Sequence, residues 1–222
     1  MRGNGAEFNR KMCGIRCARD LRIPLPPMKS LLAFLCFFTV AHAAEPFAKG
    51  GREVSLTAGF LYSPVCATSK RPVFNYVRGD LSVGWMFCSP APLFGCDALR
   101  GNWEGLLNVF GAGSVLGSSG SLAGGRVLLR YNFVQPEARW VPFFQVGAGI
   151  LGNNVYRDRS QKIIGSGFEF TLVADAGVRY FATRQWAVVF MIDFEHISNA
   201  NTGCRNIGVN ALGGSVGVSR FF

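Results

Sequence analysis

The chain lacks the residue patterns of several common functional classes. It holds only two histidines, His42 and His196, and none of its seven cysteines belongs to a Cys-x-x-Cys pair. This argues against a zinc or iron–sulfur site, and we expect no metal and no cofactor. The glycine-rich 111–125 region is not followed by the Gly-Lys-Ser/Thr ending of a phosphate-binding loop, so it is interpreted as a loop and a strand start.

The first 44 residues have the pattern of a targeting segment. Met28 is followed by a lysine, an apolar run and a stretch of small residues, which are the three parts of a secretory signal peptide. The apolar run is too short to cross a bilayer of about 30 Å as a helix. We therefore expect residues 28–44 to be a signal peptide cleaved after Ala43 or Ala44. Residues 1–27 are interpreted as a misassigned extension upstream of the true start.

Much of the positive charge lies in this leader. Residues 1–44 contain seven of the 23 basic and two of the 13 acidic residues, which leaves 16 basic and 11 acidic residues and lowers the net charge from +10 to +5. No cluster of Lys and Arg with interleaved aromatic residues remains, which argues against nucleic-acid binding. The small surplus suits an anionic lipid surface, and solvated loop charges explain it equally well.

The rest of the chain, about 178 residues, has no apolar run of 18 residues, so no membrane-spanning helix is expected. Its segments instead alternate between apolar and polar residues and are separated by turn residues. A period of two is the pattern of a β-strand whose two faces differ. It predicts eight strands, near 52–62, 72–87, 98–112, 122–134, 140–152, 166–181, 184–198 and 208–222.

The polar face of these strands carries charges of both signs. In the third segment Trp103 and Leu107 alternate with Glu104 and Asn108. An apolar outer face, a polar inner face and about ten residues per crossing are typical of an outer-membrane barrel. Backbone groups that face lipid must be paired, so the sheet has to close. We therefore predict an all-β fold, an eight-stranded antiparallel transmembrane β-barrel over residues 45–222, in the bacterial outer membrane.

Two other barrel types fit the pattern less well. A soluble lipocalin-like barrel would turn its apolar face inward, and a porin needs a wider interior than eight strands leave. With both termini periplasmic, odd-numbered strands run outward, so the seventh ends at the outer leaflet. Aromatic residues near strand ends favour a membrane barrel, because such residues gather at membrane interfaces. They are Trp85, Trp103, Trp140, Tyr180 and Trp186.

The seventh predicted strand ends with polar residues on its lipid face. Phe190, Ile192 and Phe194 share one face, and by parity His196 and Ser198 continue it. Lipid contact does not explain an imidazole and a hydroxyl there, unless they act on lipid. Cα atoms two residues apart on one face are roughly 6.5–7 Å apart, which lets a serine reach an imidazole. A serine nucleophile needs such a base.

Two asparagines complete the candidate site. Asn210 lies on the lipid parity of the last strand, beside His196 across the hairpin, where it can orient the ring. Asn199, or backbone N–H groups that follow Ser198, would bind the oxyanion. A lone His-x-Ser is often structural, and Asn210 also fits as a loop cap. If so, the chain is a non-catalytic structural or adhesive barrel, and replacing His196 or Ser198 has no effect.

The sequence around these residues resembles a known family. Phe194-Glu195-His196-Ile197-Ser198-Asn199, followed by Asn206-Ile207-Gly208-Val209-Asn210, is similar to the motif of the PagL-type lipid A 3-O-deacylases. In that family the His and Ser are catalytic, and the fold is an eight-stranded outer-membrane barrel with its site on the outer wall. The resemblance implies a carboxylic ester hydrolase that removes the 3-O-acyl chain of lipid A in lipopolysaccharide.

The chain departs from that family at one position. The best-known members carry a Glu twelve residues after the Ser, where this chain has Asn210. An Asn can orient a histidine, but it cannot stabilise the imidazolium by charge. The departure implies lower activity or a different substrate.

Four cysteines follow the leader, and secretion permits disulfides among them. Cys88 and Cys96 flank a Ser-Pro-Ala-Pro turn and are predicted to bridge locally. Cys66 lies in the first outer loop and Cys204 in the last. Because the first and last strands of a closed barrel are neighbours, a Cys66–Cys204 bond is predicted to tie the seam. It would contribute on the order of 4–5 kcal/mol in the chain-entropy model; the alternative is two free thiols.

Overall fold

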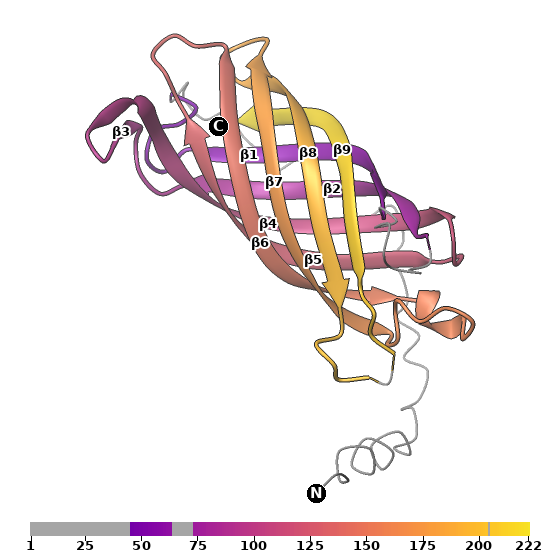
Figure 1. The fold of residues 1–222 in the computed structure, drawn as a ribbon. Coiled ribbons are helices and arrows are strands. Elements are labelled where there is room, and N and C mark those ends of the chain that lie inside the picture. Colours follow the sequence, from indigo (N-terminus) through magenta and orange to yellow (C-terminus); the bar gives the residue numbers. More distant parts are fainter. Residues whose placement is uncertain (1–44, 64–72, 204) are drawn as a thin grey trace, which may run out of the picture. The chain divides into compact units, whose positions relative to one another are not determined.

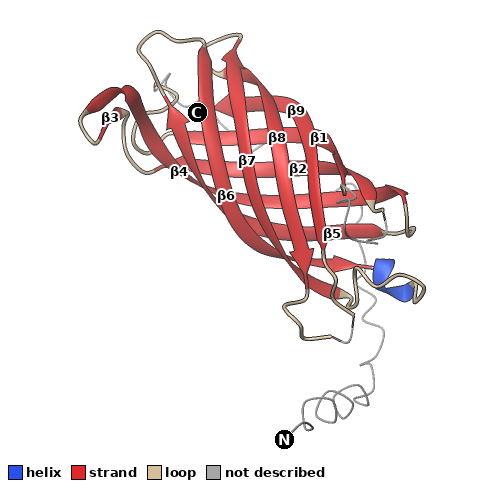
Figure 2. Ribbon diagram, viewed as in Figure 1, coloured by secondary structure: helices blue, strands red, loops and turns tan. Residues whose placement is uncertain are grey.

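The computed structural model describes residues 45–63, 73–203 and 205–222 (Figure 1). These ranges hold no helix of the length and apolar character needed to span a membrane. They consist of β-strands and one short 3-10 helix, drawn in red and blue in Figure 2. The elements are β1 (Arg52–Tyr62), β2 (Asn75–Met86), β3 (Ala91–Leu93), β4 (Cys96–Leu116), β5 (Ser121–Phe133), β6 (Trp140–Asn153), η2 (Val155–Arg157), β7 (Phe168–Phe181), β8 (Trp186–Ser198) and β9 (Val209–Phe221).

Eight of these strands form a closed antiparallel barrel. Consecutive strands pair from β4 to β9, β2 pairs with both β1 and β4, and β9 pairs back with β1 to close the sheet. The prediction of eight strands is confirmed, with ends that differ by a few residues. The largest difference is at β4, which runs from Cys96 to Leu116 and projects beyond its neighbours together with β3 (Figure 1).

The barrel has an apolar outside and a polar inside. Large apolar side chains such as Leu56, Val127 and Ile192 are 59 to 69% exposed, whereas Asp193 and Glu195, on the other face of the strand that carries Ile192, are fully buried. The soluble barrel with an inward apolar face is therefore excluded. An outer surface of this kind is stable only where lipid covers it.

Paired charges fill the middle of the interior. A buried charge is costly without a partner, because the low dielectric of the interior disfavours isolated ions. Arg179, for example, is fully buried and donates hydrogen bonds to Glu53 at 2.5 Å and Glu104 at 3.3 Å. The interior ions form two groups, Arg78 and Arg126 with Asp80, Asp193 and Glu195, and Arg130 and Arg179 with Glu53 and Glu104.

The two ends of the barrel differ. The loop end carries the β4–β5, β6–β7 and β8–β9 connections, and the terminus end carries Glu45 and Phe222. At the loop end, apolar residues of the β6–β7 loop pack into the barrel mouth with barrel residues such as Leu61 and Ile197. The loop residues in this cluster are Val155, Ile163 and Ile164.

The aromatic residues near strand ends lie at one end of the barrel, on several strands around it. Trp85, at the end of β2, and Trp186, at the start of β8, both lie near the terminus end. Trp140 stacks on Tyr180 with ring centroids 4.7 Å apart. Arg220 lies over the rings of Trp186 and Phe222, so this cation on the lipid-facing side has aromatic partners. The arrangement matches an interfacial girdle.

The predicted Cys88–Cys96 bridge is wrong, because both residues are free thiols. The segment between them is a hairpin rather than a tight turn, since β3 folds back onto the start of β4. The Cys88 carbonyl accepts a hydrogen bond from Asn102, which lies six residues beyond Cys96 along β4. Six strand residues span roughly 20 Å, so the thiols are too far apart. The predicted Cys66–Cys204 bond involves two residues outside the described ranges.

Candidate active site

The end of β8 presents a polar pair on the lipid-facing side. The strand alternates strictly, with Glu195 and Ile197 buried inside the barrel and the half-buried His196 and Ser198 on the outside. The strand then ends at Ser198, at the loop end (Figure 1). The structure thus places both residues on the face that parity predicted.

His196 is hydrogen-bonded on both sides of its ring. Nε2 lies 3.1 Å from Ser198 Oγ, and Nδ1 lies 2.6 Å from Asn210 Oδ1. The second contact follows from the sheet register, because His196 and Asn210 are directly opposed on β8 and β9. With the Asn210 oxygen as acceptor, Nδ1 carries the ring proton, and the free electron pair of Nε2 faces the serine hydroxyl. The chain Ser–His–Asn is the arrangement of an activated nucleophile.

Apolar side chains surround this pair on the barrel wall. On β7, Leu172 is opposed to His196 and Phe170 to Ser198. Both are exposed on the outer surface, as are Phe194 and Leu212. A polar pair set in such a surface is placed to meet the acyl chains of a lipid.

Gly208, the residue before β9, lies next to His196 and Ser198. The sequence pattern did not identify it as part of the site. Its φ of +75° lies in the left-handed region that favours glycine. A Cβ atom at this position would lie 3.5 Å from His196 Cε1 and 3.6 Å from Ser198 Cβ. Its place in the Asn-Ile-Gly-Val-Asn segment was the available signal, because a glycine before a strand often marks a special backbone conformation.

The Asn199 side chain lies away from the pair. It is fully buried, its Nδ2 donates to the Arg205 carbonyl at 3.0 Å, and its backbone N–H donates to Asn206 Oδ1 at 3.0 Å. The prediction that this side chain binds the oxyanion is therefore corrected. Parity gives the reason, since a residue next to Ser198 points to the opposite face of the strand.

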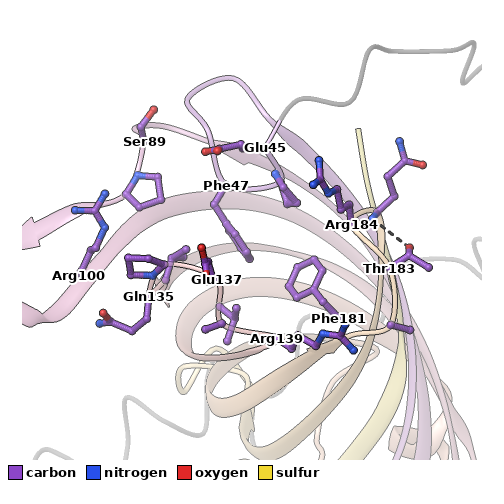
Figure 3. A pocket seen from close by; sticks show the side chains of 18 residues that line it. Glu45, Phe47, Ser89, Arg100, Gln135, Glu137, Arg139, Phe181, Thr183 and Arg184 are labelled. Atoms are coloured by element: carbon purple, nitrogen blue, oxygen red, sulfur yellow. Dashed lines mark hydrogen bonds between the residues drawn. The ribbon is translucent and has the colours of Figure 1, made fainter.

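A hollow lies at the terminus end of the barrel. It has a volume of about 920 Å³ and is lined by the β5–β6 and β7–β8 turns and by residues near Glu45 (Figure 3). Arg100, Arg139 and Arg184 border it together with Glu137. It holds no serine–histidine pair, and it lies at the opposite end of the barrel from His196. We therefore assign the candidate chemistry to the wall of β8 and β9.

Metal ligation has no evident place in the described ranges. No group of three or more His, Cys, Asp or Glu side chains there is arranged to hold an ion.

The fold and the site together define a class, an outer-membrane β-barrel with a serine–histidine pair on its outer wall. The family model described as lipid A 3-O-deacylase (PagL) matches residues 74–219. This is more than half of the chain, which therefore belongs to the PagL family of lipid A deacylases.

Several solved structures are similar to the chain. The crystal structure of the outer-membrane enzyme PagL is 17% identical and has a TM-score of 0.52, with 74% of this chain and 97% of that chain covered. Neisserial surface protein A is 14% identical, with a TM-score of 0.49 and coverage of 78% and 100%. The N-terminal barrel of Pseudomonas aeruginosa OprF is 13% identical, with a TM-score of 0.41 and coverage of 78% and 98%. No curated protein has a significant sequence match to the chain.

Proposed function

We propose that the protein is a serine esterase that removes the ester-linked 3-O-acyl chain from lipid A in the outer leaflet. The observation that carries the proposal is the hydrogen-bonded chain from Ser198 through His196 to Asn210 on the lipid-facing wall. A nucleophile placed there meets an ester within the membrane, at the level where a glycolipid joins its acyl chains to the sugar. Membership in a lipid A deacylase family supports the same substrate.

The reaction follows from the roles that the geometry permits. Ser198 Oγ attacks the ester carbonyl while His196 Nε2 takes its proton. His196 then gives this proton to the sugar oxygen, which leaves as a hydroxyl, and the acyl group stays on Ser198. Water then attacks the acyl-enzyme while His196 takes one of its protons, and His196 returns this proton to Ser198 Oγ as the fatty acid leaves. Asn210 keeps the ring oriented throughout, because its Oδ1 accepts the hydrogen bond from Nδ1.

The oxyanion needs donors other than the Asn199 side chain. We assign it to backbone N–H groups beyond Asn199, because the Asn199 N–H already donates to Asn206 Oδ1. The chain turns sharply there, since Ala200 and Asn201 both have positive φ values of 50° and 61°. Such backbone conformations are uncommon for residues other than glycine and often occur at functional sites.

Mass spectrometry of lipid A tests the function directly. Cells that express the protein should produce lipid A that lacks one hydroxyacyl group, and fragmentation of this product should place the loss at the 3-position ester. Ser198→Ala should restore the full mass without changing the amount of inserted barrel. Unmodified lipid A in cells with well-folded wild-type protein would overturn the proposal and favour the non-catalytic barrel.

The proposed location requires export. We propose that residues 28–44 form the signal peptide, with cleavage after Ala43 or Ala44. N-terminal sequencing of the protein purified from outer membranes should begin at Ala44 or Glu45. A mature protein that begins upstream of Met28 would contradict the proposal.

A further inference from the structure

The residue that follows the nucleophile is held by several hydrogen bonds. Asn199 donates from its backbone N–H to Asn206 Oδ1 and from Nδ2 to the Arg205 carbonyl, both at 3.0 Å. Its own carbonyl accepts from the Thr202 N–H at 3.0 Å and from Thr202 Oγ1 at 2.7 Å. Ser198 thus leads directly into a residue whose position is set by the β8–β9 loop.

The Arg205 side chain fixes that loop to the neighbouring one. Nη2 donates to the Tyr156 carbonyl at 2.7 Å, and Nη1 donates to the carbonyls of Asp158 and Gln161 at 3.0 and 2.9 Å. Each of these acceptors is a neutral backbone oxygen of the β6–β7 loop. A planar guanidinium with five donors suits a geometric role of this kind, which the compact ammonium of lysine cannot reproduce.

The position of the β6–β7 loop is set by its packing in the barrel mouth. Its Val155, Ile163 and Ile164 belong to the buried apolar cluster in the barrel mouth. Gln161 is itself buried and closes the loop internally, because its Oε1 accepts from the N–H groups of Ile163 and Ile164 at 2.8 and 2.9 Å. Barrel packing therefore defines the position of the carbonyls that Arg205 reaches.

Two further contacts connect the same loops beside the catalytic pair. The N–H groups of Ile207 and Gly208 donate to the carbonyls of Lys162 and Ile163 at 3.2 and 3.0 Å. The loops also approach very closely at Gly165, where a Cβ atom would lie 1.8 Å from the Arg205 carbonyl oxygen. That oxygen is the acceptor of Asn199 Nδ2, so the contact leads back to the residue after Ser198.

We propose that Arg205 is a positioning residue for the nucleophile. Its side chain holds the β8–β9 loop against the β6–β7 loop by hydrogen bonds. Its carbonyl accepts a hydrogen bond from Asn199, and this contact keeps the neighbouring Ser198 within hydrogen-bond distance of His196. The inference rests on the proposed function to the extent that Ser198 is the nucleophile. It assigns Arg205 no contact with the substrate.

The test separates positioning from lipid binding. The rate at which a small, water-soluble fluorophosphonate labels Ser198 reports the Ser198–His196 geometry and does not involve lipid A. A displacement of about 1 Å can cost on the order of 100-fold in rate, so Arg205→Ala should slow labelling by about 10- to 100-fold. Arg205→Lys should remain slow, and added guanidinium ion should partly rescue Arg205→Ala. Arg159→Ala, which removes an exposed charge from the β6–β7 loop, is the matched control and should label at the wild-type rate.

Two glycine substitutions test the contact between the β6–β7 and β8–β9 loops without changing any charge. Gly165→Ala forces the Arg205 carbonyl to move and should slow labelling as Arg205→Ala does. Gly152→Ala is its control, because a Cβ atom there has only an ordinary 3.8 Å contact with the Gly167 carbonyl. Trypsin should cut the β6–β7 loop of Arg205→Ala at least about tenfold faster than that of the wild type, since the loop loses three hydrogen bonds.

The outcomes distinguish the two proposals. Wild-type labelling rates in folded Arg205→Ala and Gly165→Ala, judged by heat-modifiable migration of the barrel, overturn the positioning role. Reduced lipid A turnover in Arg205→Ala with an unchanged labelling rate also overturns it, because Arg205 would then act on the substrate. Wild-type protein that labels at Ser198 but leaves lipid A intact overturns the proposed substrate and leaves the positioning role standing.

Discussion

Asn210 offers the sharpest test of how this site works, because it replaces the acidic residue of the better-known family members. The substitution Asn210→Asp keeps the shape of the side chain and should keep its oxygen near the 2.6 Å separation from His196 Nδ1. The new carboxylate would accept the same hydrogen bond and would also stabilise the imidazolium that forms when Ser198 gives up its proton.

The expected gain follows from the two kinds of hydrogen bond. A bond between neutral groups contributes roughly 0.5–1.5 kcal/mol, and one to a charged group roughly 1.5–3 kcal/mol. The carboxylate accepts this bond in the ground state as well, so only its added attraction to the imidazolium lowers the barrier. We take that attraction as about 1–1.5 kcal/mol, the size of the difference between the two kinds of bond. At about 1.4 kcal/mol per tenfold in rate, Asn210→Asp should raise kcat by about five- to tenfold. Asn210→Ala should lower kcat by at least about tenfold, because the ring loses its orienting acceptor.

Fatty acid release from lipid A in detergent micelles measures both effects. Asn154→Asp is the matched control, because it adds the same charge at an exposed position at the same end of the barrel. Its side-chain oxygen accepts from the Ser121 N–H and does not contact His196. It should leave kcat within about twofold of the wild type, since an exposed charge is strongly screened.

Equal rates for the wild type and the folded Asn210→Ala protein would refute the orienting role and would leave Asn210 as a loop cap. A folded Asn210→Asp protein that is slower than the wild type would refute the argument from charge.

Two further predictions concern stability and covalent structure. Arg179→Met should lower the stability of the barrel by about 3–5 kcal/mol, because Glu53 and Glu104 lose a buried cationic partner; an unchanged urea midpoint in lipid vesicles would contradict this. Non-reducing peptide mapping should find Cys88 and Cys96 unlinked, and a peptide that joins them would show that the β3 hairpin is not formed.

Strand periodicity carried most of the prediction of the fold. The side chains of a strand alternate between two faces whatever its neighbours are, so the sequence alone separated Ile192 and Phe194 from Asp193 and Glu195. With lipid outside and paired charges inside, the backbone groups of every strand can be paired only if the sheet closes into a barrel. The same parity placed His196 and Ser198 on the outer wall. Hairpin connectivity placed Asn210 beside His196, and the register agrees.

Strand parity also predicts the direction of the Asn199 side chain. Asn199 follows Ser198 and therefore points inward, which excludes its side chain from the oxyanion. The hairpin that separates Cys88 from Cys96 was missed for a different reason. Its first strand is only three residues long, too short for alternation to be visible, and it forms only because the first residues of β4 extend far enough to pair with it.

The order of the residues specifies what repeats at a period of two, namely the strands, the two faces of the wall and the face that bears the serine and histidine. How the loops meet depends on the tertiary structure. The three carbonyls that Arg205 reaches lie more than 40 residues earlier in the chain, and they converge because Val155, Ile163 and Ile164 bury themselves in the barrel mouth. Every residue has a backbone carbonyl, so no sequence pattern predicts which carbonyls a guanidinium will reach.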